Sequence, residues 1–496
     1  MIAADRRAYR FAPLDETGWL LGLQVPQCLI LGAGLGTATL LLQVGAPPLG
    51  ALAVLVGAIA ASFVGIGGTR AYEWLPVAGR HVHGSITGAS RWRRPIGRRE
   101  ATACEWPPAL DGIEIIDLGP VPLADGPVAV GAVADRRHRS LSTTVRVRGR
   151  GFSLVERAEQ ERLVALWGDV LAGFCGERGE VSSVRVSEWS APADLESHER
   201  FFAEHGASRG TRPAAEYQAL LDAAEPRTVG HEALVTVTVD ERRLRGRRGA
   251  AKAQAIADST REQLRALIAR LDAAGLHASP LDRADLASTL RSRLDPAAVR
   301  GGTRSAWRTL AGAAGIDAGH VVSPMALDTT WSNVRVDGSW HRAFWISDWP
   351  RLDVGPSWFE GLLLHAGGVR SIVLHYEPVR PSRARRRVDR DSTRLAADEQ
   401  QRSRTGFRIG AAHRRAQAAV HEREAELVAG YAELDFVGFV VVSAPTEAEL
   451  DRVAAEYEHA ASQAGVNLRA LDGRHDLGLV CSLPLGRGLA TRRVAS

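Results

Sequence analysis

The chain has 496 residues, more than one ordinary domain holds, and this length predicts two or three folded units. Charged residues make up 24% of it and hydrophobic residues 45%, which excludes a fibrous or wholly disordered protein. The net charge of +5 is small for this length. It favours a place beside an anionic membrane leaflet and does not by itself indicate nucleic-acid binding.

Two charge-free apolar stretches lie near the N-terminus, at residues 19–44 and 49–68, and only a short Gly-Ala-Pro-Pro turn separates them. About 20 apolar residues in a helix cross the ~30 Å of a bilayer's hydrocarbon. The sequence therefore predicts an α-helical transmembrane hairpin of two spans over residues 19–68, which follows a cytoplasmic segment at 1–18. A cleaved signal peptide and a buried hairpin of a soluble protein are the alternatives.

Arginine placement predicts the orientation of this hairpin. Arginines precede the first stretch and follow the second, and the connecting turn has none. Because positive residues favour the cytoplasmic side, we expect a multi-pass protein of the inner (plasma) membrane with both termini in the cytoplasm. Membrane lipids are then its first predicted partners.

Small residues recur along the two apolar stretches at helical spacing, which permits close contact between helices. Such contact joins either the two helices of the hairpin or separate subunits of an oligomeric assembly. The candidate helix-packing residues are Gly32, Gly36, Gly57, Ala61 and Gly65.

A juxtamembrane linker is predicted at 69–106, followed by a first α+β cytoplasmic region at 107–325. Alternating and apolar runs predict strands in this region, and three- and four-residue apolar spacing predicts helices. The expected strands are 113–118, 127–133, 143–147, 151–155, 181–189 and 231–239. The main expected helices begin after 157, run from the basic patch at 242–248 to about 274, and cover 281–294.

A second α+β cytoplasmic region is predicted at 326–496, and the sheets of both regions are expected to be mixed or antiparallel. Its expected strands are 340–349, 371–378, 436–442 and 477–483. A long polar helix should run from 383 to 430 with a break near Gly406 and Gly410. A helix at 446–465 begins with Thr-x-x-Glu, which is typical of a capping box.

The basic half of the long polar helix is a candidate partner surface. A solvated helix face is the commoner explanation of such a run of charge. The residues concerned are Arg383, Arg385, Arg386, Arg387 and Arg390.

Known catalytic motifs are missing from the sequence. Lys252 is the only lysine, and it lies in Gly-Ala-Ala-Lys rather than in a phosphate-binding Gly-Lys-Ser/Thr loop. Gly-x-Ser-x-Gly and His-Glu-x-x-His are absent as well, and His81 and His83 lack further ligands nearby in sequence. The four cysteines are far apart, which argues against a disulfide framework or a zinc site. We therefore expect no enzyme activity, no cofactor and no metal; an enzyme with an unrecognised site is a less favoured alternative.

Several segments carry a family resemblance. Arg-Phe-Ala-Pro-Leu-Asp-Glu-Thr-Gly-Trp-Leu-Leu-Gly-Leu at 10–23, followed by the apolar hairpin, resembles PrgI-like proteins of actinobacterial conjugation systems. Trp-Ile-Ser-Asp-Trp-Pro at 345–350, Val-Val-Val-Ser-Ala-Pro-Thr-Glu at 440–447 and Leu-Pro-Leu-Gly-Arg at 483–487 are similar to the N-terminal, non-motor domain of conjugative type IV secretion ATPases. The motor domain itself is missing.

This resemblance implies a structural component of a conjugation or type IV-like secretion apparatus. Such a component would anchor or dock a separate VirB-type secretion ATPase and other secretion subunits at the inner membrane. A type VII secretion core subunit of the EccE kind is the alternative, since that family also has two N-terminal spans and a cytoplasmic body. DNA contact by the basic helix is possible but has no support in the sequence.

Overall fold

A computed structural model of the chain describes residues 25–66, 69–95, 105–149, 151–192, 201–202, 204–205, 211–224, 229–244, 250–299, 303–313, 318–350, 352–365, 367–404 and 410–488. The predicted cytoplasmic segment at 1–18 and the start of the first apolar stretch lie outside the described residues.

The described helices of four residues or more, in chain order, are α1 Val25–Gln43, α2 Pro48–Phe63, α3 Ala71–Thr87, α4 Arg157–Ala172, α6 Arg212–Ala224, α7 Ala250–Ala273, α8 Arg283–Leu294, α9 Thr303–Gly312, α10 Ala318–Val322, α11 Glu360–Leu363, α12 Pro381–Arg404, α13 Ala411–Val428, α14 Glu447–Gln463 and α15 His475–Ser482.

The described strands are β1 Gly65–Ile66, β2 Thr69–Arg70, β3 Arg91–Arg93, β4 Ile113–Leu123, β5 Gly126–Asp135, β6 Ser140–Arg148, β7 Val181–Pro192, β8 Val229–Asp240, β9 His277–Pro280, β10 Ala326–Thr329, β11 Val334–Val336, β12 Ser339–Asp348, β13 Val369–Pro378, β14 Leu434–Ala444 and β15 Asn467–Ala470.

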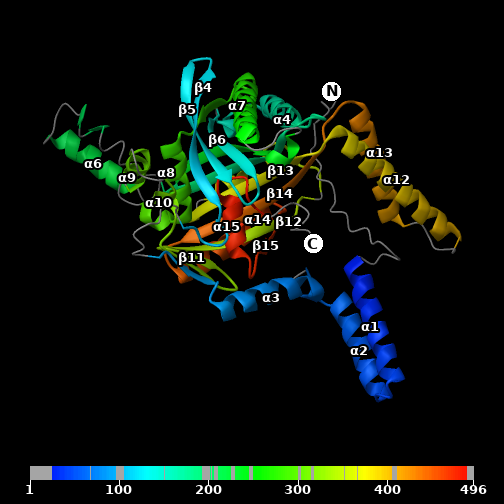
Figure 1. The fold of residues 1–496 in the computed structure, drawn as a ribbon. Coiled ribbons are helices and arrows are strands. Elements are labelled where there is room, and N and C mark those ends of the chain that lie inside the picture. The colour runs from blue at the N-terminus through cyan, green and yellow to red at the C-terminus, as the bar shows by residue number, and fades with distance from the viewer. Residues whose placement is uncertain are drawn as a thin grey trace.

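One antiparallel sheet of 13 strands forms the centre of the body (Figure 1). Its order is β3-β10-β11-β12-β14-β13-β7-β8-β6-β5-β4, while β15 pairs with β12 and β9 pairs with β6. The β13–β7 pairing joins strands from the two predicted α+β regions, because Arg370 lies opposite Ser190 and Tyr376 opposite Val184. The expectation of two α+β units with sheets of their own is therefore corrected to a single continuous sheet.

The connectivity of this sheet repeats. In the first half the chain runs β6, β7, β8, α7, β9, α8, and β6 pairs with both β8 and β9. In the second half it runs β12, β13, β14, α14, β15, α15, and β12 pairs with both β14 and β15. The two halves meet at β7 and β13, so the order of strands reads alike from the middle toward either edge.

The two faces of the sheet carry separate apolar cores. Along β14, Phe439 and Val441 pack into the core beneath α8 and α15, whereas Val440 and Val442 pack beneath α14 on the other face. A third core lies between α7 and the strands of the first half, with Leu264 fully buried in it. Because both of its faces are covered, β14 reads as a continuous apolar run from 436 to 442 rather than as an alternating one.

Each half sends a short segment across the strands of the other. Residues 294–299, the first strap, follow α8 and meet β12: Ser339 donates to Asp295 Oδ1 at 2.8 Å, and the Leu294 carbonyl lies 3.0 Å from His341 Nε2. Residues 483–487, the second strap, follow α15 and meet β6, where Thr144 Oγ1 lies 3.5 Å from the Pro484 carbonyl. This reciprocal crossing ties the two halves into one body.

The predicted transmembrane hairpin of two spans is wrong. Only α1 is long and apolar enough to cross a bilayer among the described residues, judged by length and composition, and a signal sequence near the N-terminus would pass the same test. The second helix, α2, has 16 residues because the chain turns extended at Val64 and then enters the β1–β2 hairpin. At 1.5 Å per residue, such a helix is about 24 Å long, short of the ~30 Å needed.

Of the other local predictions, some are confirmed and some are wrong. The capping box is confirmed in its first part, because Thr446 accepts a hydrogen bond from the Glu449 backbone N–H at 3.3 Å. The long polar helix is also confirmed, as α12 and α13 with residues 405–409 between them. The strand expected at 477–483 is instead the helix α15, and that expected at 151–155 holds a 3₁₀ turn.

Candidate interaction site

The apolar helices α1 and α2 pack side by side and extend away from the body (Figure 1). Neither contains a charged residue, and many of their large aliphatic side chains are exposed. The helices approach most closely at Gly34, where an added Cβ would overlap the Ala58 Cβ. Gln27 also donates to the Ser62 carbonyl at 2.8 Å. These contacts fix the pair internally and leave its outer surface apolar.

The predicted helix-packing residues lie mostly beside this contact rather than in it. A Cβ at Gly32, Gly36 or Gly57 would meet nothing within 4 Å. Ala61 is half-buried, and Gly65 falls in β1. The close approach therefore uses Gly34, which is not among the predicted helix-packing residues. A role for the open glycines in contact with another subunit stays a prediction.

The helix α3 lies in the predicted linker and is held against the body by one face. The ring of Trp74 lies 5.6 Å from that of Trp331, and the His81 ring meets Trp331 edge-on at 5.3 Å, measured between centroids. Val77 is buried beside them, and Arg80 forms a 2.9 Å ion pair with Asp476 next to α15. The helix α3 is thus docked on the body, although only the β1–β2 hairpin separates it in the chain from the apolar α1–α2 pair.

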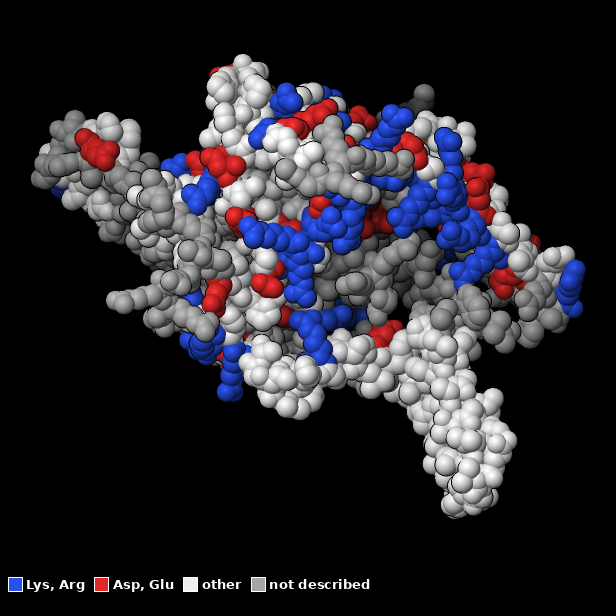
Figure 2. All heavy atoms as spheres, in the orientation of Figure 1, with Lys and Arg blue, Asp and Glu red and all other residues white. Residues whose placement is uncertain are grey.

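The opposite face of α3 is apolar and exposed. Leu75 is 68% exposed, Val82 54% and Ile86 80%. Because these residues follow one another at intervals of seven and four, they form a single stripe along the helix. In Figure 2 the same region is a pale surface with arginine side chains beside it, between the body and the α1–α2 pair.

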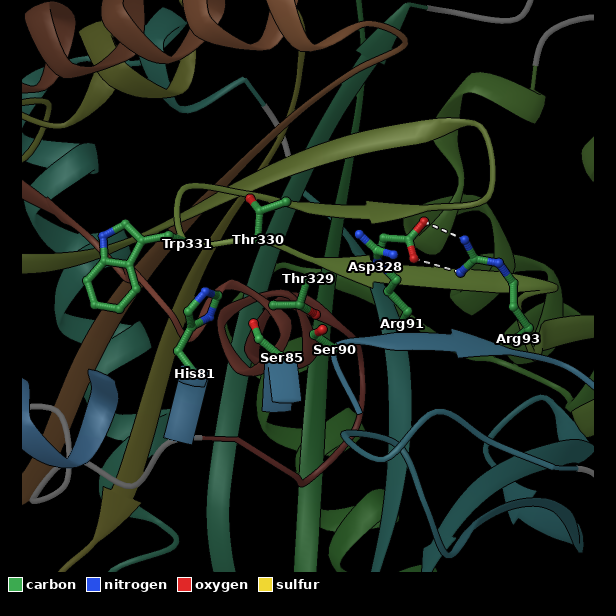
Figure 3. A pocket seen from close by; sticks show the side chains of 9 residues that line it. All are labelled: His81, Ser85, Ser90, Arg91, Arg93, Asp328, Thr329, Thr330 and Trp331. Carbon is green, nitrogen blue, oxygen red and sulfur yellow. Dashed lines mark hydrogen bonds and ion pairs between the residues drawn. The ribbon is translucent and has the colours of Figure 1, made fainter. Parts of the chain in front are cut away.

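A hollow of about 500 Å³ opens where α3 meets β3 and β10 (Figure 3). Arg93 binds both carboxylate oxygens of Asp328, at 2.7 and 2.8 Å, which neutralises that acid. Arg91 also lines the hollow and forms no ion pair within the part of the chain that the structure describes. The hydroxyl-bearing Ser85 and Ser90 lie between it and His81. The hollow therefore combines one uncompensated positive charge with hydroxyl donors.

The predicted basic surface lies at the start of α12, where four of its five arginines are exposed. The exception is Arg387, which pairs with Glu433 and Asp435 at 2.8 Å, and these partners raise the pKa of its guanidinium. Burial, with Arg380 and Arg383 close by, lowers the pKa of Arg243. Figure 2 shows arginines gathered beside the α12–α13 pair. This pair projects from the body and offers a charged surface to a partner.

A buried arginine that sequence reasoning missed holds the second strap. Arg185 on β7 is 2% exposed and donates to the carbonyls of Leu483 and Arg487 at 2.8 Å, and also to that of Leu485. Burial lowers the pKa of Arg185 to about 10, so it keeps its charge at neutral pH. The sequence offered only a weak indication that Arg185 is buried: Ser183 and Ser187, on the same face of β7, are uncharged.

The second strap ends in an ion pair that is likewise buried. Arg487 donates to both carboxylate oxygens of Asp135, at 2.7 and 2.8 Å, and to the backbone carbonyls of Ala109 and Asp111. Burial pushes the pKa of Asp135 upward, but the hydrogen bonds from Arg487 and from the His138 backbone outweigh it, and the net pKa lies below its ordinary value. This pair ties the C-terminal strap to β5.

The first strap is held by a histidine of β12, His341, which should make the fold sensitive to acid. Burial lowers the pKa of His341 to about 4, which keeps the ring neutral. Its stabilising contribution is complete above the ordinary pKa of 6.5 and is lost as the pH falls from there toward 4. That shift corresponds to roughly 3 kcal/mol. Urea unfolding in detergent at pH 7 and pH 4.5 should show a smaller loss of stability for His341→Gln than for the wild type. The exposed His421→Gln serves as control, and an equal loss in all three proteins would contradict the assignment.

No group of three or more His, Cys, Asp or Glu side chains in the described part of the chain is arranged to hold a metal ion. His81 lies against Trp331 and His83 is exposed, so the structure gives the H-x-H pair no common ligand site. Comparison with protein-family models and with curated proteins finds no match to this chain.

Proposed function

We propose that the chain is a membrane-associated, non-enzymatic component of a conjugation or type IV-like secretion apparatus, and that it holds a separate VirB-type motor ATPase at the inner membrane. The observation that carries the membrane part is the α1–α2 pair, which has no charged residue and exposes aliphatic side chains such as Leu35 and Leu40, each 60% exposed. Apolar surface of this extent needs a lipid or protein partner. The resemblance of segments 10–23 and 345–350 supports the assignment to a secretion apparatus.

Membrane association is tested by alkaline extraction of membranes from cells that express the full chain. We expect the wild type to stay in the membrane pellet. The double variant Leu35→Arg and Leu40→Arg should move to the extract, because an arginine near the centre of a membrane helix costs about 2.5–3.5 kcal/mol. The control is Leu154→Arg, at a 91% exposed position in the body. Release of the wild type itself would overturn the membrane proposal.

Docking of the motor protein is assigned to the α12–α13 pair. Its exposed arginines offer a charged surface that an acidic partner complements, and such complementarity mainly sets recognition and association rate. Arg387 is excluded from this surface because Glu433 and Asp435 already occupy it.

The docking test changes only the exposed arginines to glutamate: Arg383, Arg385, Arg386 and Arg390. We expect the wild type to co-purify from detergent with a co-expressed VirB-type ATPase, and the reversed variant to lose the ATPase while it remains membrane-bound. The control reverses four exposed arginines on other elements: Arg136, Arg148, Arg162 and Arg212. Equal recovery of the ATPase with both variants would contradict docking through α12.

A further inference from the structure

We propose that the hollow between α3 and the β3–β10 edge binds the phosphate headgroup of an anionic phospholipid, while the apolar stripe of α3 lies among the acyl chains. This inference rests on the proposed membrane association and adds the lipid class and the residues that recognise it. The occupant is a bilayer surface because α3 is in contact with α2 of the apolar pair, and both α3 and the pair expose aliphatic side chains.

The charge of the hollow suits a phosphate. Its acidic member, Asp328, has both oxygens engaged by Arg93, so the two charges cancel. Arg91 then supplies a net positive charge, and the side chains of Ser85 and Ser90 form no hydrogen bond within the described residues, which leaves their hydroxyls able to donate to phosphate oxygens. Guanidinium and hydroxyl groups are common phosphate ligands in proteins.

The hollow and the stripe lie next to each other on α3. Ser85 is three residues after Val82 and four after His81, so it lies between the stripe and the docked face of the helix. Figure 3 shows the Ser85 side chain directed from α3 toward the strands of the hollow. A headgroup in the hollow would therefore have its acyl chains close to Leu75, Val82 and Ile86, as an interfacial helix requires.

This arrangement has a mechanical consequence. The docked face of α3 is held to the body through Trp331 and Asp476, so lipid bound at its outer face orients the whole sheet relative to the membrane. A flexible linker could not transmit that orientation. A body held in this way presents any partner surface, α12 included, at a constant direction from the bilayer.

The test uses the full chain reconstituted into nanodiscs of phosphatidylcholine, with or without phosphatidylglycerol, and measures amide hydrogen exchange in α3. We expect phosphatidylglycerol to slow exchange in α3. Arg91→Ala should need about fivefold more phosphatidylglycerol for half of the effect, in line with the contribution of one arginine near an anionic surface. Arg148→Ala on β6, also at an exposed arginine, is the matched control and should behave as the wild type.

The remaining measurements distinguish a phospholipid site from free phosphate binding and from a failure of the membrane proposal. Inorganic phosphate added to phosphatidylcholine nanodiscs should leave exchange in α3 unchanged; protection by phosphate alone would overturn a lipid ligand. Equal protection in both lipids, or an Arg91→Ala variant that matches the wild type, would overturn the site. The triple variant Leu75→Ser, Val82→Ser and Ile86→Ser should lose the protection while α1 stays protected in the nanodisc. Loss of protection in α1 would point instead to a failure of the membrane proposal.

Discussion

Replacing Arg185 with leucine should lower the free energy of unfolding by about 3–5 kcal/mol, because each buried polar group left without its partner costs about 1–3 kcal/mol. The guanidinium donates to three backbone carbonyls of the second strap, whose residues are all buried. Leucine has no donor, so the carbonyls of Leu485 and Arg487 would lose the hydrogen bond from Arg185, and that of Leu483 would keep only the bond from the Leu485 backbone N–H. Lysine should restore only part of the stability, because one ammonium lacks the planar, forked geometry of a guanidinium.

Urea unfolding in detergent, followed by tryptophan fluorescence, measures this loss. Limited proteolysis gives a second readout, since release of residues 483–487 should expose new cleavage sites near the C-terminus of the body. Arg162→Leu removes an exposed arginine whose partner is three residues away and should leave the unfolding midpoint unchanged. If Arg185→Leu unfolds at the same midpoint and resists protease as the wild type does, the strap does not depend on this side chain.

Removal of Asp135 should cost a similar amount, about 3–5 kcal/mol, because the variant Asp135→Ala leaves Arg487 buried without its counter-charge. The double variant Asp135→Leu with Arg487→Leu should be more stable than the single alanine variant, since an apolar pair leaves no buried charge. A double-mutant cycle measures this coupling. Additive single effects would contradict a direct dependence between the two side chains.

The Asp135–Arg487 pair also makes the stability of the fold depend on pH in acid. The pKa of Asp135 is lower in the folded than in the unfolded chain, so its contribution to stability is present above the ordinary carboxyl pKa and is lost as the pH falls through the folded value. Acid unfolding of Asp135→Asn should therefore depend less on pH below 4 than that of the wild type. This window lies below the one expected for His341, so the two effects can be separated along one titration.

The features that the sequence predicted correctly are those whose stability depends on residues close together in the chain. The N-cap at Thr446 and the positive φ of Gly275 after α7 depend on residues within one helical turn, and both were readable in the chain. The break expected near Gly406 and Gly410 falls mostly at residues 405–409, which lie outside the described residues; α13 begins directly after Gly410. The segment 477–483 was ambiguous, because a short apolar run fits a buried strand and a buried helix alike. Packing against β12, β13 and β14 makes it helical.

Long-range pairing decided what the sequence left open. The repeat of connectivity in the two halves was not visible as repeated residues, because a shared topology needs only shared apolar patterning. The second strap covers the serine and threonine side chains of β6 and β8 at Gly486. Arg185 lies opposite Thr236 on β8, and alternation along a strand cannot tell a face that meets water from one that meets a buried polar strap.

The sequence by itself determined that two apolar, charge-free stretches lie near the N-terminus and that a large α+β body follows them, because composition and local periodicity depend only on neighbouring residues. The tertiary structure alone decided that α2 stops at Phe63, that α3 is docked with an exposed stripe, and that both halves share one sheet tied by reciprocal straps. These features depend on contacts between residues far apart in the chain, such as Arg80 with Asp476 and Arg185 with Leu483, whose energies no local pattern records.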